Sequence, residues 1–328
     1  MKKNVLIDNR WAGDTGIGRL YKEVMMRKPV EVSTSFVKSQ LSLGSIYTPI
    51  MLAQAIKASS ADIFYSPSFM PPLYSNIPFV FTVHDLMHLF YYSGFHKIYY
   101  KQVIGRLAKK AKKIITVSHF SKHQLVDLLG INENIITVIY NGVDDNFLLN
   151  NEKYEMENPY LLYVGNRRKN KNIPAMLEAF AKANIPNEIT LALTGNEDKV
   201  LADEINKLGI KQRVKFLGFV TDEELPKLYK GALATLYVSL MEGFGLPIIE
   251  SMASGTPVLT STASSLPEIA GDAALCVNPL DTAAITNGIE RLVNDSSLYQ
   301  HYVLEGKKRA LDFKWQDTAF HTWETILH

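Results

Sequence analysis

Two glutamates eight positions apart, Glu242 and Glu250, carry the most informative pattern of the chain. Pro247 stands between them, and proline is favoured at the first position of a helix, where its missing N–H is not needed. We therefore expect a helix that begins at Pro247, carries Glu250 about one turn in and ends at Gly255. The free N–H groups and positive dipole end of a helix N-terminus bind phosphate. Carboxylates beside that point suit sugar hydroxyl groups, so the segment predicts a site for a nucleotide sugar.

Strands and helices alternate along the chain, and they must position these glutamates. Short apolar runs bounded by turn residues predict strands at 5–8, 63–66, 79–83, 113–117, 135–139, 160–164, 189–194, 214–216, 234–238, 257–260 and 274–277. Between them lie helical patterns, such as the apolar face formed by Ile173, Met176, Leu177 and Phe180. This alternation predicts an α/β fold of parallel sheets covered on both faces, with ligands beyond the carboxyl ends of the strands.

The length of 328 residues favours two domains. Residues 150–159 are polar, charged and without periodicity, as in a linker. We therefore expect a first domain over 1–153 and a second domain that begins at 154.

The composition excludes several classes of protein. A hydrophobic content of 47% and a charged content of 21% are ordinary for a globular enzyme. The net charge of +2 argues against nucleic acid as a partner, because domains that bind it are usually strongly basic. Cys276 is the only cysteine, which favours a reducing, cytoplasmic compartment and no disulfide framework. We expect no signal peptide and no membrane span, since no apolar run approaches about 18 residues.

Residues 90–113 combine aromatic side chains with a cluster of lysines and arginines. This mixture suits an anionic membrane surface, where each nearby lysine contributes about 1 kcal/mol. An ordinary helix with a solvated lysine face explains the same pattern. The segment Phe90–Lys113 is thus a candidate for weak peripheral contact with a membrane.

At this point the residues resemble a known family over nearly the whole chain. The chain is similar to retaining glycosyltransferases of the GT-B fold, in the group 1 family (family 4) that includes many bacterial polysaccharide enzymes. The Glu-x7-Glu pair is the main signature of that family. The other matching segments, in order, are 82–86 (Thr-Val-His-Asp-Leu), 117–122 (Val-Ser-His-Phe-Ser-Lys), 140–144 (Tyr-Asn-Gly-Val-Asp), the basic loop 163–172, 265–269 (Ser-Leu-Pro-Glu-Ile) and 271–274 (Gly-Asp-Ala-Ala).

The resemblance implies two doubly wound Rossmann-like domains that face a cleft. Residues 1–153 would bind the acceptor, 154–310 the nucleotide sugar, and a final helix over 311–328 would pack back on the first domain. The implied reaction moves a hexose, with retained configuration, to a saccharide or lipid-linked saccharide in cell-surface polysaccharide synthesis. GDP-mannose is favoured as donor over UDP-sugars, and no cofactor or metal is needed.

The resemblance also assigns roles to residues. Glu250 would bind the ribose hydroxyls, Glu242 the donor sugar near the reacting carbon, and Lys171 the diphosphate leaving group. His84, just past the strand at 79–83, would lie near the donor sugar. The catalytic set is then Glu242, Lys171 and His84. The donor-binding set is Glu250, Gly16, Gly18, Ser118, Asn166, Arg167, Phe219, Val220, Gly243, Phe244, Gly245 and Leu246.

Several of these residues also fit a structural role. Ser118 could equally cap the helix that follows, and Gly16 and Gly18 could form a plain strand-to-helix turn. The family usually has an arginine where this chain has Asn166, so Arg167 or Arg168 would have to supply the second cation.

Alternative functions are a nucleotide-sugar-binding module that lost catalysis, or an epimerase or phosphorylase on a similar scaffold. Thr221 and Glu224 are expected to form a capping box.

Overall fold

The computed structural model describes residues 2–13 and 15–328. The chain forms two compact units: one comprises Met1–Gly142 with Lys314–His328, and the other Val143–Phe313. In the described residues no helix is both long enough and apolar enough to cross a membrane.

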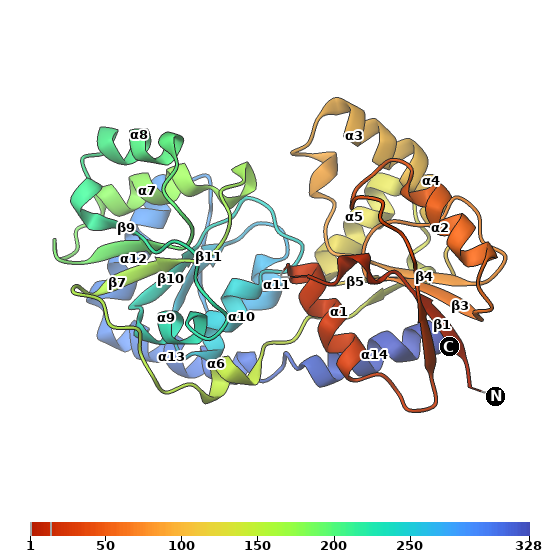
Figure 1. Ribbon diagram of the computed structural model, residues 1–328. Coiled ribbons are helices and arrows are strands. Elements are labelled where there is room, and N and C mark those ends of the chain that lie inside the picture. The colour runs from red at the N-terminus through yellow and green to blue at the C-terminus, as the bar shows by residue number, and fades with distance from the viewer. Residues whose placement is uncertain (1, 14) are drawn as a thin grey trace. The chain divides into compact units, whose positions relative to one another are not determined.

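The first unit contains a six-stranded sheet in the order β2-β1-β3-β4-β5-β6 (Figure 1), and every neighbouring pair is parallel. Its strands are β1 (Asn4–Ile7), β2 (Ser33–Phe36), β3 (Ile63–Ser66), β4 (Phe79–Val83), β5 (Lys113–Thr116) and β6 (Ile136–Val138). Its helices are α1 (Gly16–Met26), α2 (Thr48–Lys57), α3 (Gly94–Tyr99), α4 (Gly105–Ala108), α5 (His119–Leu129) and α14 (Trp315–Leu327), with a π-helix η3 (Tyr100–Ile104) between α3 and α4 and short 3-10 turns η1 (Asn9–Trp11), η2 (Met87–Leu89) and η4 (Glu133–Ile135).

Strand β1 shows how this sheet divides its core. Successive side chains of a strand point to opposite faces. Leu6 accordingly joins the apolar cluster under α2 and α5, which includes Leu52 and Leu125. Its neighbours Val5 and Ile7 join the cluster on the other face, under α1 and α14. Helices therefore cover both faces, as the apolar runs require.

Helix α14 is anchored to the first unit by two tryptophans. Trp315 and Trp323 are 3% and 2% exposed and belong to the same cluster as Val24 of α1. The indole Nε1 of Trp323 donates a hydrogen bond of 2.8 Å to the carbonyl of Val24. Thr318 donates to the carbonyl of Tyr140 at 2.7 Å. The C-terminal helix is thus part of the core of the N-terminal sheet.

The second unit holds another parallel six-stranded sheet, in the order β12-β11-β10-β7-β8-β9 (Figure 1). Its strands are β7 (Tyr160–Tyr163), β8 (Thr190–Leu193), β9 (Val214–Phe216), β10 (Ala234–Tyr237), β11 (Val258–Ser261) and β12 (Leu275–Val277). Its helices are α6 (Asp145–Leu149), α7 (Ile173–Lys182), α8 (Lys199–Lys207), α9 (Leu225–Gly231), α10 (Leu246–Ala253), α11 (Leu266–Ala270), α12 (Thr282–Asn294) and α13 (Ser296–Ala310), with 3-10 turns η5 (Lys169–Lys171) and η6 (Lys211–Arg213).

Two parallel doubly wound sheets confirm the predicted fold class, and each expected strand is present within one or two residues at its ends. Strand β2 was not predicted. Its sequence Ser-Thr-Ser-Phe has no apolar run, because it lies at the edge of the sheet with partly exposed side chains. Backbone pairing with β1 holds it in place.

The boundary between the units differs from the expected one. The chain passes between the units after Gly142 and again after Phe313, rather than at 153–154 and 310–311. Packing explains the difference, because Phe147 of α6 lies edge-on against Tyr229 with 5.8 Å between ring centres. Residues 143–153 therefore join the second unit in spite of the polar stretch that follows them.

Candidate active site

The second unit brings its charged residues together at the point where its strand order reverses. Strands β7 and β10 are neighbours in the middle of the sheet, and the chain runs outward from them to both edges. The carboxyl ends of such neighbouring strands frame the crevice in which open α/β sheets bind ligands. The loop after β7 contributes Lys171, and the loop after β10 contributes Glu242.

Lys171 is buried by the turn that precedes α7. The next residue, Asn172, adopts a left-handed conformation with φ of 57°. Its side-chain amide ties the turn to the rest of the unit by donating to the carbonyls of Val238 (3.2 Å) and Pro279 (2.7 Å). The ammonium of Lys171 lies 2.8 Å from Oε1 of Glu242. The side chains of this pair are only 10% and 8% exposed, so the ion pair is largely withdrawn from water.

Glu242 is held by its backbone as well as by its carboxylate. Its N–H donates to Oγ of Ser264 at 3.0 Å, and its carbonyl accepts from Oγ of Ser265 at 3.0 Å. The amide of Asn170 lies 3.4 Å from the carboxylate oxygen that Lys171 also contacts. Loops from three parts of the unit therefore fix this carboxylate.

Helix α10 begins one residue earlier than expected, at Leu246, so that Pro247 takes its second position. Gly245 precedes it with φ of 114°, and a Cβ there would lie 2.8 Å from Cδ2 of Leu266. Only glycine allows this turn. The ring of Phe244 is 5% exposed and packs edge-on against Phe313, so Phe244 can offer a ligand only its backbone. Gly243 is also buried.

Glu250 lies one turn into α10 and is partly exposed. Its Oε2 accepts a hydrogen bond of 2.8 Å from the phenol of Tyr229 on α9. Burial, followed by the nearby Glu250 carboxylate, raises the pKa of Tyr229 well above its usual value. The phenol therefore stays protonated and donates to the carboxylate.

Arg167 points along the sheet toward β8. Its Nη2 donates to the carbonyl of Thr194 at 2.7 Å, and its guanidinium carbon lies 5.7 Å from the ring centre of Phe216. Burial lowers the pKa of Arg167. Among the described residues, the hydrogen bonds that join Lys171 to its partners do not include Arg167. Asn166 is exposed, and its side-chain oxygen accepts from the N–H of Arg168.

The loop after β9 places Phe219 in the open. Its side chain is 89% exposed, and Val220 beside it is partly buried. A backbone bridge between Gly195 and Gly218, with an N···O distance of 2.7 Å, fixes the start of this loop next to the end of β8. An exposed ring at such a position suits stacking on a base.

The turn that follows contains the expected capping box. Thr221 N–H donates to Oε2 of Glu224 at 3.0 Å, and Glu224 N–H donates to Oγ1 of Thr221 at 3.2 Å. This prediction is confirmed, and both residues serve the turn that leads into α9.

Comparison with known proteins gives this arrangement a family. The family model for glycosyl transferases group 1 matches residues 145–309, and that for glycosyltransferase family 4 matches residues 14–147. O-antigen chain mannosyltransferase B of Escherichia coli is 30% identical over 292 residues, which are 84% of this chain and 76% of that protein. This chain belongs to the group 1 glycosyltransferases.

Other relatives agree with this assignment. O-antigen chain mannosyltransferase RfbU of Salmonella typhimurium is 34% identical over 229 residues, covering 68% of this transferase and 64% of that protein. The crystal structure of Anabaena HepE with UDP and glucose matches the whole chain with a TM-score of 0.77 at 20% identity. WaaG, a glycosyltransferase of lipopolysaccharide synthesis, matches 98% of it with a TM-score of 0.75 at 15% identity. The resemblance found in the sequence is confirmed, and the two structures show the same fold.

In the first unit of the transferase, His84 lies just past β4 and bonds across to the end of β3. Its Nε2 lies 2.8 Å from the carbonyl of Pro67. Burial lowers the pKa of His84, so the ring is neutral near pH 7. A neutral ring that donates to Pro67 uses Nε2 for structure and keeps Nδ1 as an acceptor.

Ser118 is fully buried and caps α5, since its Oγ accepts from the N–H of Ser121 at 3.1 Å. The structural alternative for Ser118 therefore has direct support. Gly16 begins α1, and the N–H of Gly18 donates to the capping Oγ1 of Thr15 at 3.1 Å. A Cβ on Gly18 would lie 1.8 Å from the carbonyl oxygen of Gly13, so this turn closes on itself too tightly for any side chain.

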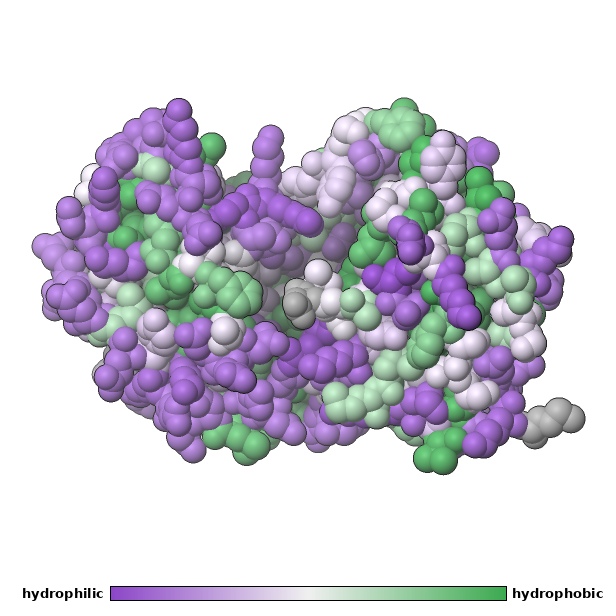
Figure 2. Space-filling view, in the orientation of Figure 1, coloured by the Kyte–Doolittle hydropathy of each residue, from purple (hydrophilic) through white to green (hydrophobic). Residues whose placement is uncertain are grey.

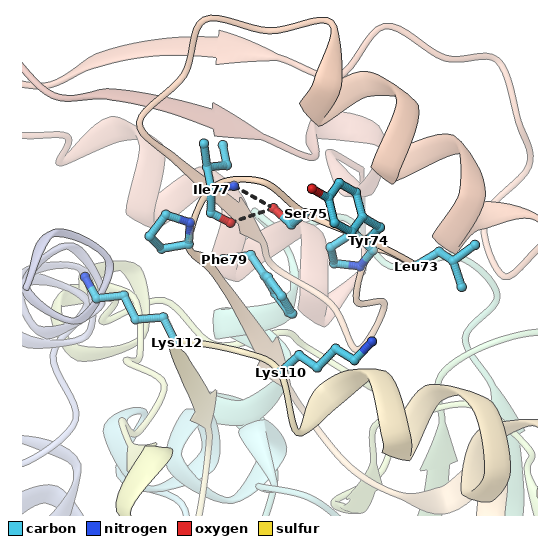
Figure 3. A pocket seen from close by; sticks show the side chains of 9 residues that line it. Leu73, Tyr74, Ser75, Ile77, Phe79, Lys110 and Lys112 are labelled. Carbon is cyan, nitrogen blue, oxygen red and sulfur yellow. Dashed lines mark hydrogen bonds between the residues drawn. The ribbon is translucent and has the colours of Figure 1, made fainter.

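A pocket of about 550 Å³ lies in the same unit at the amino ends of β4 and β5 (Figure 3). Loop 72–78 lines it together with Phe79, which begins β4, and with Lys110 and Lys112, which precede β5. Figure 3 shows the two lysines on either side of the Phe79 ring. His84 and Ser118 follow the opposite ends of these strands, so the pocket is separate from them.

Two tyrosines of the site were missed in the sequence: Tyr237, whose phenol oxygen accepts from Lys171 at 2.7 Å, and Tyr229, which contacts Glu250. Tyr237 ends a buried strand and Tyr229 lies in a short helix, and both fit the apolar pattern of their elements. Their residue type could have pointed to them, because a buried tyrosine usually has a hydrogen-bond partner for its hydroxyl.

Proposed function

We propose that this glycosyltransferase moves a hexose from a nucleotide sugar, with retention of configuration, to a saccharide or lipid-linked saccharide acceptor in cell-surface polysaccharide synthesis. The observation that carries the proposal is the buried Lys171–Glu242 pair at the switch point of β7 and β10. Beside it, α10 begins, and Glu250 follows one turn later.

The chemistry follows from where negative charge develops. The bond between the anomeric carbon and the phosphate oxygen breaks, and the nucleoside diphosphate takes the charge. Lys171 and the positive dipole end of α10 stabilise that charge, as preorganised charges and dipoles do in other transfer enzymes. Glu242 then holds hydroxyl groups of the donor sugar, and Glu250 holds those of the ribose.

Retention fits a front-face substitution. The acceptor oxygen bonds to the anomeric carbon on the side from which the diphosphate leaves, and the acceptor proton passes to the departing phosphate oxygen. The Glu242 carboxylate already shares Oε1 with Lys171 and Asn170. A carboxylate neutralised in this way is a weak nucleophile, which supports a mechanism without a covalent glycosyl-enzyme intermediate.

The donor is proposed to be GDP-mannose, with UDP-sugars next. The names of the E. coli and Salmonella relatives support mannose, whereas HepE was solved with UDP and glucose. Calorimetric titration with GDP and UDP separately decides between them, because the leaving group binds without the acceptor. Tighter binding of GDP is the expected result, and a clear preference for UDP would overturn this assignment.

We also propose that transfer needs no metal ion, since Lys171 and the start of α10 supply the positive charge at the diphosphate. Turnover is then unchanged by EDTA. A loss of activity that Mg²⁺ or Mn²⁺ restores would contradict this proposal.

Peripheral contact with the cytoplasmic face of a membrane through residues 90–113 is a further part of the proposal. Phe95 and Ile98 are 63% and 65% exposed, and Lys109 is exposed as well. Figure 2 shows apolar side chains interspersed with polar ones in the region of α3 and α4. Binding to vesicles of anionic phospholipid should be weak and should fall with salt. Cosedimentation that is unaffected by Lys109→Glu combined with Lys112→Glu would exclude this contact.

Product analysis tests the reaction itself. A transferase lengthens the acceptor, an epimerase changes the donor without an acceptor, and an inactive module does neither. Glu242→Gln keeps the shape of the side chain but removes its charge, and most of the turnover should be lost. Near-normal turnover of this variant would contradict the role given to Glu242.

A further inference from the structure

Each carboxylate of the Glu-x7-Glu pair has a buried tyrosine as a neighbour, and the two tyrosines come from different elements. Tyr237 ends β10 and faces the Lys171–Glu242 pair, whereas Tyr229 lies on α9 and contacts Glu250. Their side chains are 2% and 0% exposed.

Tyr237 connects the two charged groups of the catalytic pair. The Lys171 ammonium donates to its phenol oxygen at 2.7 Å and also lies 4.9 Å from the centre of its ring. Burial and then the Glu242 carboxylate raise the pKa of Tyr237 well above its usual value, so the phenol stays neutral. A neutral phenol accepts from the ammonium and keeps its own proton available to the neighbouring carboxylate.

Tyr229 is fixed on both sides. Its ring packs against Phe147, and its backbone carbonyl accepts from Oγ1 of Thr256 at 2.6 Å. With the ring held in this way, its hydroxyl reaches Oε2 of Glu250 at 2.8 Å. This hydrogen bond helps to fix the orientation of the Glu250 carboxylate, which is partly exposed.

We propose that these tyrosines are positioning residues with separate tasks. Tyr237 sets the Lys171–Glu242 pair, which acts on the sugar and the leaving group, and Tyr229 sets Glu250, which acts on the ribose. This inference rests on the function proposed above. Interactions that strengthen in the transition state appear in kcat, whereas uniform binding of substrate appears in KM. Loss of the first phenol should therefore lower kcat, and loss of the second should weaken nucleotide binding.

The experiment compares Tyr237→Phe and Tyr229→Phe with Tyr160→Phe. Each variant keeps the ring and removes only the hydroxyl. Tyr160 is a matched control, because it is equally buried in the same unit and donates to the backbone carbonyl of Leu228 at 2.8 Å. Thermal unfolding, steady-state kinetics and nucleoside diphosphate titration are measured for all three.

Hydrogen bonds to charged groups support effects of about tenfold to hundredfold. We expect a fall of this size in kcat for Tyr237→Phe, with a smaller loss of diphosphate affinity, because Lys171 also meets the free diphosphate. For Tyr229→Phe we expect weaker diphosphate binding and a higher donor KM, with kcat largely kept. Tyr160→Phe should change unfolding alone.

Two results would overturn the inference. One is kinetics of both variants that match Tyr160→Phe, and the other is a fall in kcat and in affinity that is the same in both. The wild-type protein separates this inference from the proposed function. If it binds no nucleoside diphosphate and transfers no sugar, both fail; if it does both, a failure of the tyrosine variants concerns the tyrosines alone.

Discussion

The two units have similar parallel sheets but use charge differently where the strand order reverses. In the second unit, Lys171 and Glu242 come from loops after β7 and β10, and their ion pair links segments far apart in the chain. In the first unit, the order reverses between β1 and β3. The charged pair there is Asp8 with Arg10, two residues apart, whose side chains are joined by two hydrogen bonds of 2.7 Å.

The two charged pairs differ in what they can offer a ligand. Asp8 is fully buried, and both of its carboxylate oxygens already accept from Arg10, so the pair stabilises its own loop. In the second unit, the charged pair lies next to a helix start and to a second, partly exposed carboxylate, Glu250. A preorganised charge costs little reorganisation when the leaving group departs. The charged pair of the second unit is therefore placed to stabilise charge on a ligand, whereas that of the first unit stabilises the shape of its own loop.

The largest expected effect breaks the charged site. Lys171→Ala removes the cation that meets the leaving group, and loss of one such donor lowers kcat by about 10²- to 10³-fold. Lys169→Ala is the matched control, because Lys169 lies in the same turn but is exposed. Steady-state kinetics compare kcat of the two variants, and only Lys171→Ala should show the loss. A similar loss in both would mean that only the overall charge of the loop counts.

Folding has to be separated from catalysis in this test. Removing Lys171 leaves the buried Glu242 carboxylate without its ion-pair partner, which is costly in a folded protein. Adding Glu242→Gln to Lys171→Ala removes the stranded charge. We expect the double variant to recover part of the free energy of unfolding but none of the activity.

The second prediction concerns the shape of the first unit. Gly18→Ala would bring a Cβ to 1.8 Å from the Gly13 carbonyl oxygen, so the backbone must move. Overpacking of this kind costs about 1–3 kcal/mol of the free energy of unfolding. A Cβ on Gly13 meets nothing within 4 Å, so Gly13→Ala should stay within about 0.5 kcal/mol of wild type. Denaturant unfolding compares them, and equal stabilities would show that the turn adapts freely.

The sequence predicted the parts of the molecule that depend on local pattern. The apolar runs located the strands, and Pro247 located the start of α10 to within one residue. Contacts between segments far apart in the chain could not be predicted from local pattern. The polar strand β2 is held by backbone pairing with β1, and Tyr237 meets Lys171 only because β10 and β7 are neighbours. The unit boundary depended on the packing of Phe147, which a polar linker sequence cannot reveal.

The smallest expected effect is a pH dependence of stability that is confined to the first unit. Burial, with a smaller contribution from His96, lowers the pKa of His88 in the first unit to about 3. The unfolded chain binds this proton near pH 6.5, so between pH 6.5 and 3 the unfolded state holds more protons than the folded state. The stability that neutral His88 contributes is therefore full above pH 6.5 and is lost as the pH falls. From pH 7 to 5.5, the loss is about 1 kcal/mol.

His88→Phe tests this directly. The His88 ring packs at a tilt of 34° against Tyr100, with 3.6 Å between ring centres, and lies 5.5 Å from Phe69. A phenyl ring therefore keeps these contacts without the titration. Hydrogen exchange resolved by segment should show the first unit opening before the second on acidification of the wild type. In the variant, this early opening should move to lower pH. An unchanged response would show that His88 does not cause the acid sensitivity of this unit.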